Sequence, residues 1–249
     1  MRYILFLSII SVLTVAGGCA STGIDGKTAS YHYQMGLSYL EERNYTAALI
    51  ELSEAEKANP GDAELQYQLG RALVGKRRLD LAEQRFMRAL VLRPNYSEAR
   101  NDLGVVYLEL GRWDSAIQQF KIVKNDLFYP YQDHAVINLG LGYLGKGDYT
   151  NALKELDNLK ATAPRNPLLR VAIGRVYFAQ NQLERAIDEF QTALDIAPEY
   201  AAAHFHLGLT LMKQKKYAAA AASFETVVRT SPDSENGRNA QHYLELLKQ

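Results

Sequence analysis

The sequence has one cysteine, one tryptophan and no excess of charge of either sign. A single cysteine excludes an intramolecular disulfide. The 28 basic and 28 acidic side chains cancel, which argues against a dedicated nucleic-acid-binding protein, because such proteins usually carry a clear basic surplus. With 47% hydrophobic and 22% charged residues, the composition also excludes disordered, collagen-like and multi-span membrane proteins. The function of this ordinary folded chain therefore has to be read from its motifs.

The chain begins with a pattern that is typical of an export signal. Arg2 precedes an apolar run over residues 3–15, and three small residues follow at 16–18. A positive start, a short apolar core and small residues at its exit describe a secretory signal peptide. The run is shorter than the stretch of about 20 apolar residues that spans a bilayer. We therefore expect residues 1–18 to be a signal peptide.

Cys19 stands directly after the small residues, at the end of this signal. The sequence Ala-Gly-Gly-Cys at 16–19 resembles the lipobox of bacterial lipoproteins, in which the cysteine becomes the lipidated first residue. This resemblance implies a lipid anchor on Cys19, and Ala20 after it implies delivery to the outer membrane, facing the periplasm. An ordinary exported protein with an incidental thiol and an uncleaved anchor are the alternatives. Residues 19–28 are small and polar, so we expect a flexible tether there.

A glycine-centred motif recurs along the rest of the chain. An apolar residue precedes each glycine, an alanine stands twelve residues after it, and a large apolar residue follows four residues later. The interval is 34 residues, except for 36 between the third and fourth glycines, and the glycines are Gly36, Gly70, Gly104, Gly140, Gly174 and Gly208. Small residues let two helices approach closely, and the proline that closes each unit cannot continue a helix. The pattern predicts a repeated pair of packed helices.

This pattern resembles the tetratricopeptide repeat (TPR), a helix–turn–helix unit of 34 residues. The resemblance implies an all-α fold, in which the repeats stack into a right-handed superhelix and only the whole stack buries a core. The six units are 29–62, 63–96, 97–132, 133–166, 167–200 and 201–234. The remaining segment, 235–249, is expected to form a capping helix.

In the TPR family, ligands contact positions 5 and 9 of each unit, among others, on the concave surface that the first helices line. In this sequence the corresponding residues are Tyr33, Leu37, Tyr67, Arg71, Asn101, Val105, Ile137, Leu141, Val171, Arg175, Phe205 and Leu209. The set is mostly apolar and aromatic, with two arginines and one asparagine. It lacks the combination of Lys and Asn with which chaperone-binding TPR domains hold a terminal carboxylate. We therefore expect a groove for an apolar extended segment or an amphipathic helix. Alternatively, these side chains pack partly against neighbouring repeats or the N-terminal segment.

No residue set in the sequence predicts catalysis, a metal or a cofactor. Residues 140–145 match the Gly-x-Gly-x-x-Gly string of nucleotide-binding loops, but they lie inside a predicted helix rather than after a strand. His204 and His206 are two residues apart and point to different helix faces, whereas a zinc pair on a helix needs a spacing of four. We therefore expect a non-enzymatic protein that needs no cofactor and no metal.

The junction after the third unit carries the two-residue insertion. Its segment at residues 120–130, which stays apolar through the turn, and the following residues 138–141 resemble the corresponding part of the type IV pilus biogenesis lipoproteins, the pilotins of the pilus secretin. The resemblance implies a protein that binds secretin subunits and helps them to assemble in the outer membrane. The alternative is a general periplasmic adaptor lipoprotein for envelope enzymes or outer-membrane protein assembly. Either function would rest on protein binding through the groove and membrane attachment through Cys19, with no nucleic-acid partner.

Overall fold

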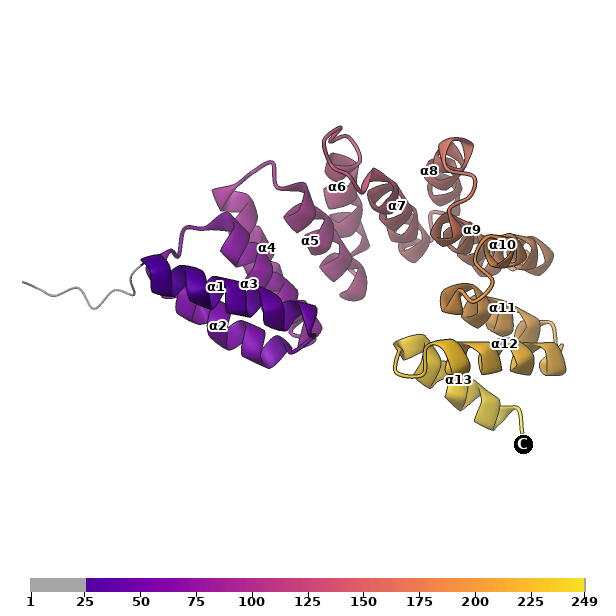
Figure 1. Ribbon diagram of the computed structural model, residues 1–249. Helices are drawn as coiled ribbons and strands as arrows, with labels where there is room; N and C mark the ends of the chain where they lie inside the picture. The colour runs from indigo at the N-terminus through magenta and orange to yellow at the C-terminus, as the bar shows by residue number, and fades with distance from the viewer. Residues whose placement is uncertain (1–25, 249) are drawn as a thin grey trace, which may run out of the picture.

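The computed structural model describes residues 26–248, which are entirely helical apart from turns and loops. The signal peptide, Cys19 and the tether up to residue 25 lie outside the described residues. Figure 1 shows the helices following one another along an arch. They are α1 (Gly26–Glu41), α2 (Tyr45–Ala58), α3 (Ala63–Gly75), α4 (Leu79–Leu92), α5 (Ser97–Glu109), α6 (Trp113–Val123), α7 (Gln132–Lys146), α8 (Tyr149–Thr162), α9 (Pro167–Ala179), α10 (Leu183–Ile196), α11 (Ala201–Lys213), α12 (Tyr217–Thr230) and α13 (Glu235–Leu246).

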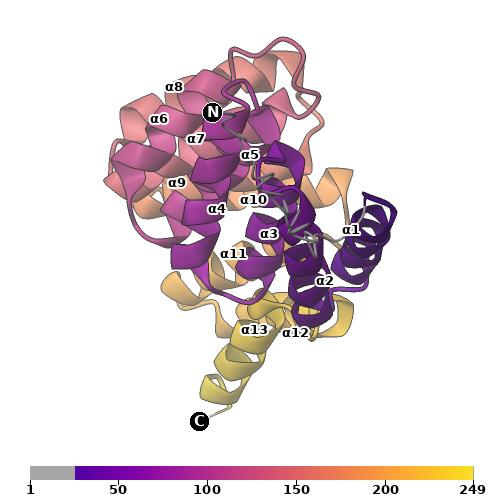
Figure 2. The same ribbon diagram turned by 90° about the vertical axis from the view of Figure 1, so that its left-hand side faces the viewer.

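The helices form six pairs followed by α13, as a TPR superhelix requires. Each odd-numbered helix contacts the next odd-numbered one, from α1 with α3 to α11 with α13. The second helices of neighbouring pairs have no comparable contact within the described residues. Such a stack curves toward the side on which its elements lie closer together, so the first helices line the concave face. Figure 2 views the arch from the end formed by α1–α4, with the later helices behind them.

The repeated glycines lie where the two helices of a pair cross. A Cβ atom added to Gly104 would lie 2.5 Å from a ring carbon of Phe120, and one added to Gly174 would lie 2.4 Å from Phe190. Both phenylalanines are fully buried. No larger side chain fits between helix and ring at this separation, because interiors are close-packed. The glycine of each repeat therefore allows the two helices of a pair to approach closely, as the sequence pattern predicted.

Each helix pair turns through one residue in the left-handed region of backbone space. Gly111 and Gly147 fill this position in two pairs, with φ angles of 69° and 79°. In the other four pairs the residue is not glycine; these residues are Arg43, Arg77, Asn181 and Lys215. The left-handed conformation costs a non-glycine residue about 1 kcal/mol, so these turns are maintained by the packing of the helices on either side.

The structure differs from the sequence prediction at the start of the repeats. The helix α1 begins at Gly26, so residues 26–28, expected to be part of a flexible tether, belong to it. These three residues are exposed and polar or small. They extend a helix whose other end is fixed by the burial of Gly36 and Leu40.

The insertion forms the longest junction between two pairs, from the end of α6 at Val123 to the start of α7 at Gln132. Tyr129 is buried there beside Val123 and Ala135. Leu127 and Phe128, by contrast, are 85% and 95% exposed. One aromatic side chain therefore fixes the loop to the stack, while two large apolar side chains project into solvent.

Candidate peptide-binding groove

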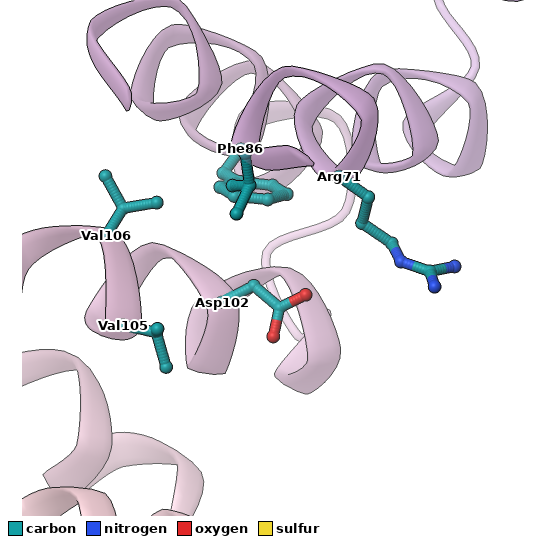
Figure 3. Close-up of a pocket in the computed structure, with 6 residues that line it drawn as sticks. Arg71, Phe86, Asp102, Val105 and Val106 are labelled. Carbon is teal, nitrogen blue, oxygen red and sulfur yellow. The ribbon is translucent and has the colours of Figure 1, made fainter. Parts of the chain in front are cut away.

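A first hollow of about 200 Å³ lies on the concave face between α3 and α5. Figure 3 shows its apolar wall of Phe86, Val105 and Val106, with Arg71 and Asp102 at the polar end. Arg71 projects from α3 and Asp102 from α5, so the charged end lies between two neighbouring repeats.

Asp102 is held by its neighbours. The Tyr67 hydroxyl donates to one carboxylate oxygen at 3.1 Å, and the Asn101 side-chain amide donates to the other at 3.2 Å. Burial raises the pKa of Asp102, although these two hydrogen bonds and the charge of Arg71 act in the opposite direction. Arg71 itself donates to Gln68 at 2.9 Å and lies 5.8 Å from the centre of the Tyr67 ring. The charged groups of the first hollow therefore have hydrogen-bond partners within the protein, although at Asp102 burial has the larger effect.

The polar contacts continue into the next repeat. The Asn138 side chain, on α7, donates to the Asn101 oxygen at 3.3 Å. A chain of hydrogen bonds thus runs from Tyr67 through Asp102 and Asn101 to Asn138, across the first helices of three repeats. It lies along the groove and fixes the spacing of its central helices.

A second hollow, of about 380 Å³, extends from α5 past α7 to α9. Val105 lines both hollows, so the two hollows adjoin at this side chain. We refer to the two hollows together as the groove. The wall of the second is largely apolar; it consists of Val105, Leu108, Glu109, Trp113, Asn138, Leu141, Leu144, Gly145 and Arg175. Glu109 already pairs with Arg77, at 2.7 Å, on the neighbouring repeat.

Arg175 is the one basic residue among those that line the second hollow. Burial lowers its pKa, and no ion pair or hydrogen bond joins its side chain to another described residue. His206, from α11, lies close enough that the Arg175 charge adds to the effect of burial, and together they lower the pKa of His206 to about 3. The imidazole is therefore neutral near pH 7 and stacks on Phe190, with 5.8 Å between the ring centres.

The two repeat positions predicted to contact ligands, 5 and 9, differ in their accessibility to solvent in the structure. The position 9 side chains are at least partly accessible; they are Leu37, Arg71, Val105, Leu141, Arg175 and Leu209. At position 5 only Tyr33 and Tyr67 are partly accessible. Four predicted contacts are buried instead, namely Asn101, Ile137, Val171 and Phe205. Position 5 points between neighbouring first helices, which touch one another in this stack, so the expectation of packing against neighbouring repeats applies there.

Tyr67 is also less available to a ligand than its position suggests. Its ring lies 5.0 Å from that of Tyr96 and 5.9 Å from that of Phe86, and its hydroxyl bonds to Asp102. Tyr67 therefore contributes to the packing between the second and third repeats, and its expected role as a free groove residue is corrected to a mainly structural one.

Sequence reasoning missed Asp102 and Asn138, which both stand at position 6 of their units. A signal was present, because position 6 is polar in five of the six units. The residues there are Gln34, Gln68, Asp102, Asn138 and His206, with Ala172 as the exception. Polar side chains on the groove-facing side of a helix, next to apolar neighbours, indicate a recognition surface or a buried hydrogen-bond network.

Within residues 26–248 no group of three or more His, Cys, Asp or Glu side chains is arranged to hold a metal ion. In the same part of the chain, no helix combines the length and the apolar character that crossing a membrane requires. The groove itself is built from apolar walls and a few polar groups.

The sequence profile described as "Tetratricopeptide repeat" matches residues 33–96, 67–126, 137–201 and 171–235. These overlapping matches cover well over half of the chain. The chain belongs to the tetratricopeptide repeat family. The TPR helices, rather than any added domain, therefore make up the described structure, and proteins built from this repeat are generally non-catalytic scaffolds.

Several known proteins resemble this TPR chain. A tetratricopeptide repeat protein from Parabacteroides merdae has the same fold, with a TM-score of 0.81 and 16% identity over 90% of this chain and 86% of its own. The structure of PilW, described as a widely conserved type IV pilus biogenesis factor, gives a TM-score of 0.70 and 19% identity over 87% of this chain and all of its own. The type IV pilus assembly protein PilF of Pseudomonas aeruginosa is 26% identical over 110 residues, 44% of each chain. The chain spans less than half the length of the curated relatives that it matches.

Proposed function

We propose that this protein is a TPR scaffold of the bacterial outer membrane that binds a protein partner in its concave groove and acts in type IV pilus biogenesis. The observation that carries the binding function is the pair of adjoining hollows between α3 and α9, with accessible apolar side chains along them. Grooves of this kind hold extended segments or amphipathic helices. The likeness to PilF and PilW supports the pilus role, in which the partner is a secretin subunit.

The lipid anchor belongs to the same proposal. The Ala-Gly-Gly-Cys sequence at 16–19 supports lipidation of Cys19, with α1 beginning at Gly26. The six residues between them, fully extended, span about 20 Å. An anchored scaffold of this kind would stay near the membrane surface and bring its bound partner there. Two or more acyl chains hold a protein stably, because each buried methylene contributes about 0.8 kcal/mol.

Site-specific photocrosslinking in membranes tests the binding function. A photoreactive amino acid replaces Leu141, which lines the second hollow, or Val91, which is 70% exposed on the second helix α4. We expect a crosslink to a secretin subunit from position 141 and none from position 91. Equal crosslinking from both positions would contradict binding in the groove. A crosslink from position 141 to an envelope enzyme or an outer-membrane assembly protein would replace the pilus role with the general adaptor role.

Replacement of Cys19 by serine tests the anchor. The Cys19→Ser variant should leave the outer-membrane fraction and keep the helical circular dichroism of the parent. Sedimentation of the variant with the outer membrane after a salt wash would overturn the proposed anchoring, whatever the groove binds.

A further inference from the structure

The unpaired guanidinium of Arg175 distinguishes it from the other partly buried cations of the molecule. Arg170 pairs with Glu189 at 3.0 Å and Lys124 pairs with Glu155 at 2.9 Å. Arg175 is also partly buried, yet no ion pair or hydrogen bond joins it to a described residue. The one carboxylate that lines the same hollow, Glu109, pairs with Arg77 instead. Withdrawal of a charge from water is costly unless an opposite charge or hydrogen-bond acceptor replaces the water. In the described structure, no ion pair or hydrogen bond to Arg175 offsets this loss of solvation.

The surroundings of Arg175 define what could supply the opposite charge. The guanidinium borders a hollow of about 380 Å³ whose other walls are largely apolar, including Leu108, Trp113 and Leu144. A guanidinium forms strong, often two-pronged hydrogen bonds with a carboxylate. The fitting ligand therefore combines a carboxylate with a large apolar group a few ångströms away.

We propose that the second hollow binds an aspartate or glutamate side chain from the interior of an extended partner segment, with the carboxylate on Arg175 and a neighbouring apolar side chain against Leu108 and Trp113. This inference rests on the proposed function, since it requires the partner to lie in the groove. It adds the chemistry by which the groove selects a partner.

An internal acidic residue fits better than a chain terminus because the groove continues on both sides of Arg175. Toward α5 it joins the first hollow at Val105. Beyond α9, Leu209 on α11 is partly accessible. A segment that passes through has a backbone on each side of its acidic residue. The Asn138 oxygen, which accepts no hydrogen bond from the described residues, is placed to accept from such a backbone N–H.

Selection from a peptide library tests this inference. Random peptides displayed with their C-termini fused to a carrier present internal acids and no free terminal carboxylate. They are selected on the wild-type protein and on Arg175→Gln. Binders are then resynthesised with blocked termini, in Glu and Gln forms, and titrated by fluorescence anisotropy. Arg71→Gln is the matched control, because Arg71 occupies the same repeat position but has internal partners.

We expect wild-type binders to share one acidic position beside an apolar residue. Changing that Glu to Gln should weaken binding to the wild type about tenfold or more, which is the effect of losing a charge-assisted hydrogen bond in a partly buried site. The same change should have little effect on binding to Arg175→Gln, and Arg71→Gln should keep the wild-type preference. Arg175→Lys should keep part of the preference, since it keeps the charge but not the planar group.

Three results would overturn the inference. Binders with no acidic preference would remove it while leaving the groove as a protein-binding site. Failure of the wild type to retain any peptide in the groove would remove the proposed function as well. Loss of folding is monitored with Arg175→Met, which should melt at or above the wild-type temperature because it removes an uncompensated buried charge. A clear fall in its melting temperature would mean that Arg175 has a structural role, and would also contradict the proposal.

Discussion

The two hollows of the groove differ in whether their arginine side chain has a hydrogen-bond partner within the protein. Arg71 and Asp102 lie at one end of the hollow between α3 and α5 (Figure 3). Arg71 donates to Gln68, and the Asp102 oxygens accept from Tyr67 and Asn101. Between α5 and α9, Arg175 has no such partner among the described residues. Hydrogen bonds between repeats, as in the first hollow, stabilise the stack itself. An arginine without a partner in the free protein can form stabilising contacts only with a bound ligand. The comparison assigns a structural role to the first hollow and a recognition role to the second.

The largest effect should follow from disrupting the repeat that contributes α5 to both hollows. Gly104→Leu places a side chain where even a Cβ atom would lie 2.5 Å from the buried Phe120 ring. We expect the free energy of unfolding to fall by about 3 kcal/mol or more, the upper end of overpacking effects, as measured by urea denaturation. Gly26→Ala is the control, because no atom lies within 4 Å of a Cβ at that position. A Gly104→Leu variant as stable as the parent would show that the helix crossing is wrongly placed, and with it the shared wall of the groove.

Removal of the carboxylate from the first hollow sharpens the comparison directly. Asp102→Ala leaves the Tyr67 hydroxyl and the Asn101 amide without their acceptor and removes the negative charge near Arg71. Each unsatisfied buried polar group costs about 1–3 kcal/mol, so we expect a destabilisation of about 2 kcal/mol. The corresponding truncation in the second hollow, Arg175→Met, should show the opposite sign or no loss. Destabilisation of similar size in both variants would abolish the distinction between the two hollows.

The pH dependence of stability should also differ between the hollows. His206 does not line the second hollow, but it lies near Arg175 on that side of the groove. Burial and then the Arg175 charge lower its pKa to about 3, whereas an unfolded histidine titrates near pH 6.5. Between these values the unfolded chain binds the proton, so stability falls as the pH is lowered, by at most about 1.4 kcal/mol per pH unit. His206→Gln should flatten the curve between pH 6.5 and 4.

Asp102 contributes with the opposite sign. Its pKa is raised by burial, so the folded state binds a proton more readily than the unfolded one, and stability from this group rises as the pH falls. Asp102→Asn removes this contribution, so the stability of that variant should fall more steeply than that of the wild type as the pH is lowered. His206→Gln should show the opposite change and fall less steeply. Chemical denaturation of the three proteins at a series of pH values provides the measurement. Identical slopes for all three would show that neither group titrates abnormally in the folded protein.

The smallest effect on stability is expected at the insertion. Leu127 and Phe128 project almost fully into solvent, so Leu127→Ser with Phe128→Ser should change the free energy of unfolding by less than about 0.5 kcal/mol. Tyr129→Ala, on the buried side of the same loop, should destabilise clearly. If the double serine variant also loses the secretin crosslink from position 141, this loop is a second contact surface for the partner, and the groove is then not sufficient for recognition.

The fold could be predicted from the sequence because its determinants are local. Gly104 and Phe120 stand sixteen residues apart at a helix crossing that every unit repeats, so their spacing alone identifies the packing. The accessible position 9 residues, such as Leu141, followed from the same register. The burial of Ile137 and Val171 did not, because it depends on how closely the first helices of different repeats approach. The isolation of Arg175 could not be predicted either, since it depends on which side chains lie opposite it across the groove.

Charge reversal between protein and ligand tests the central claim most directly. A selected acidic peptide and its form with Lys in place of the acidic residue are titrated against the wild type, Arg175→Glu and Arg71→Glu. We predict that Arg175→Glu loses the acidic peptide and gains the lysine peptide, while Arg71→Glu retains the wild-type order of affinities wherever it remains folded. If Arg175→Glu binds both peptides as the wild type does, the second hollow does not read the charge of a bound segment and the account is wrong.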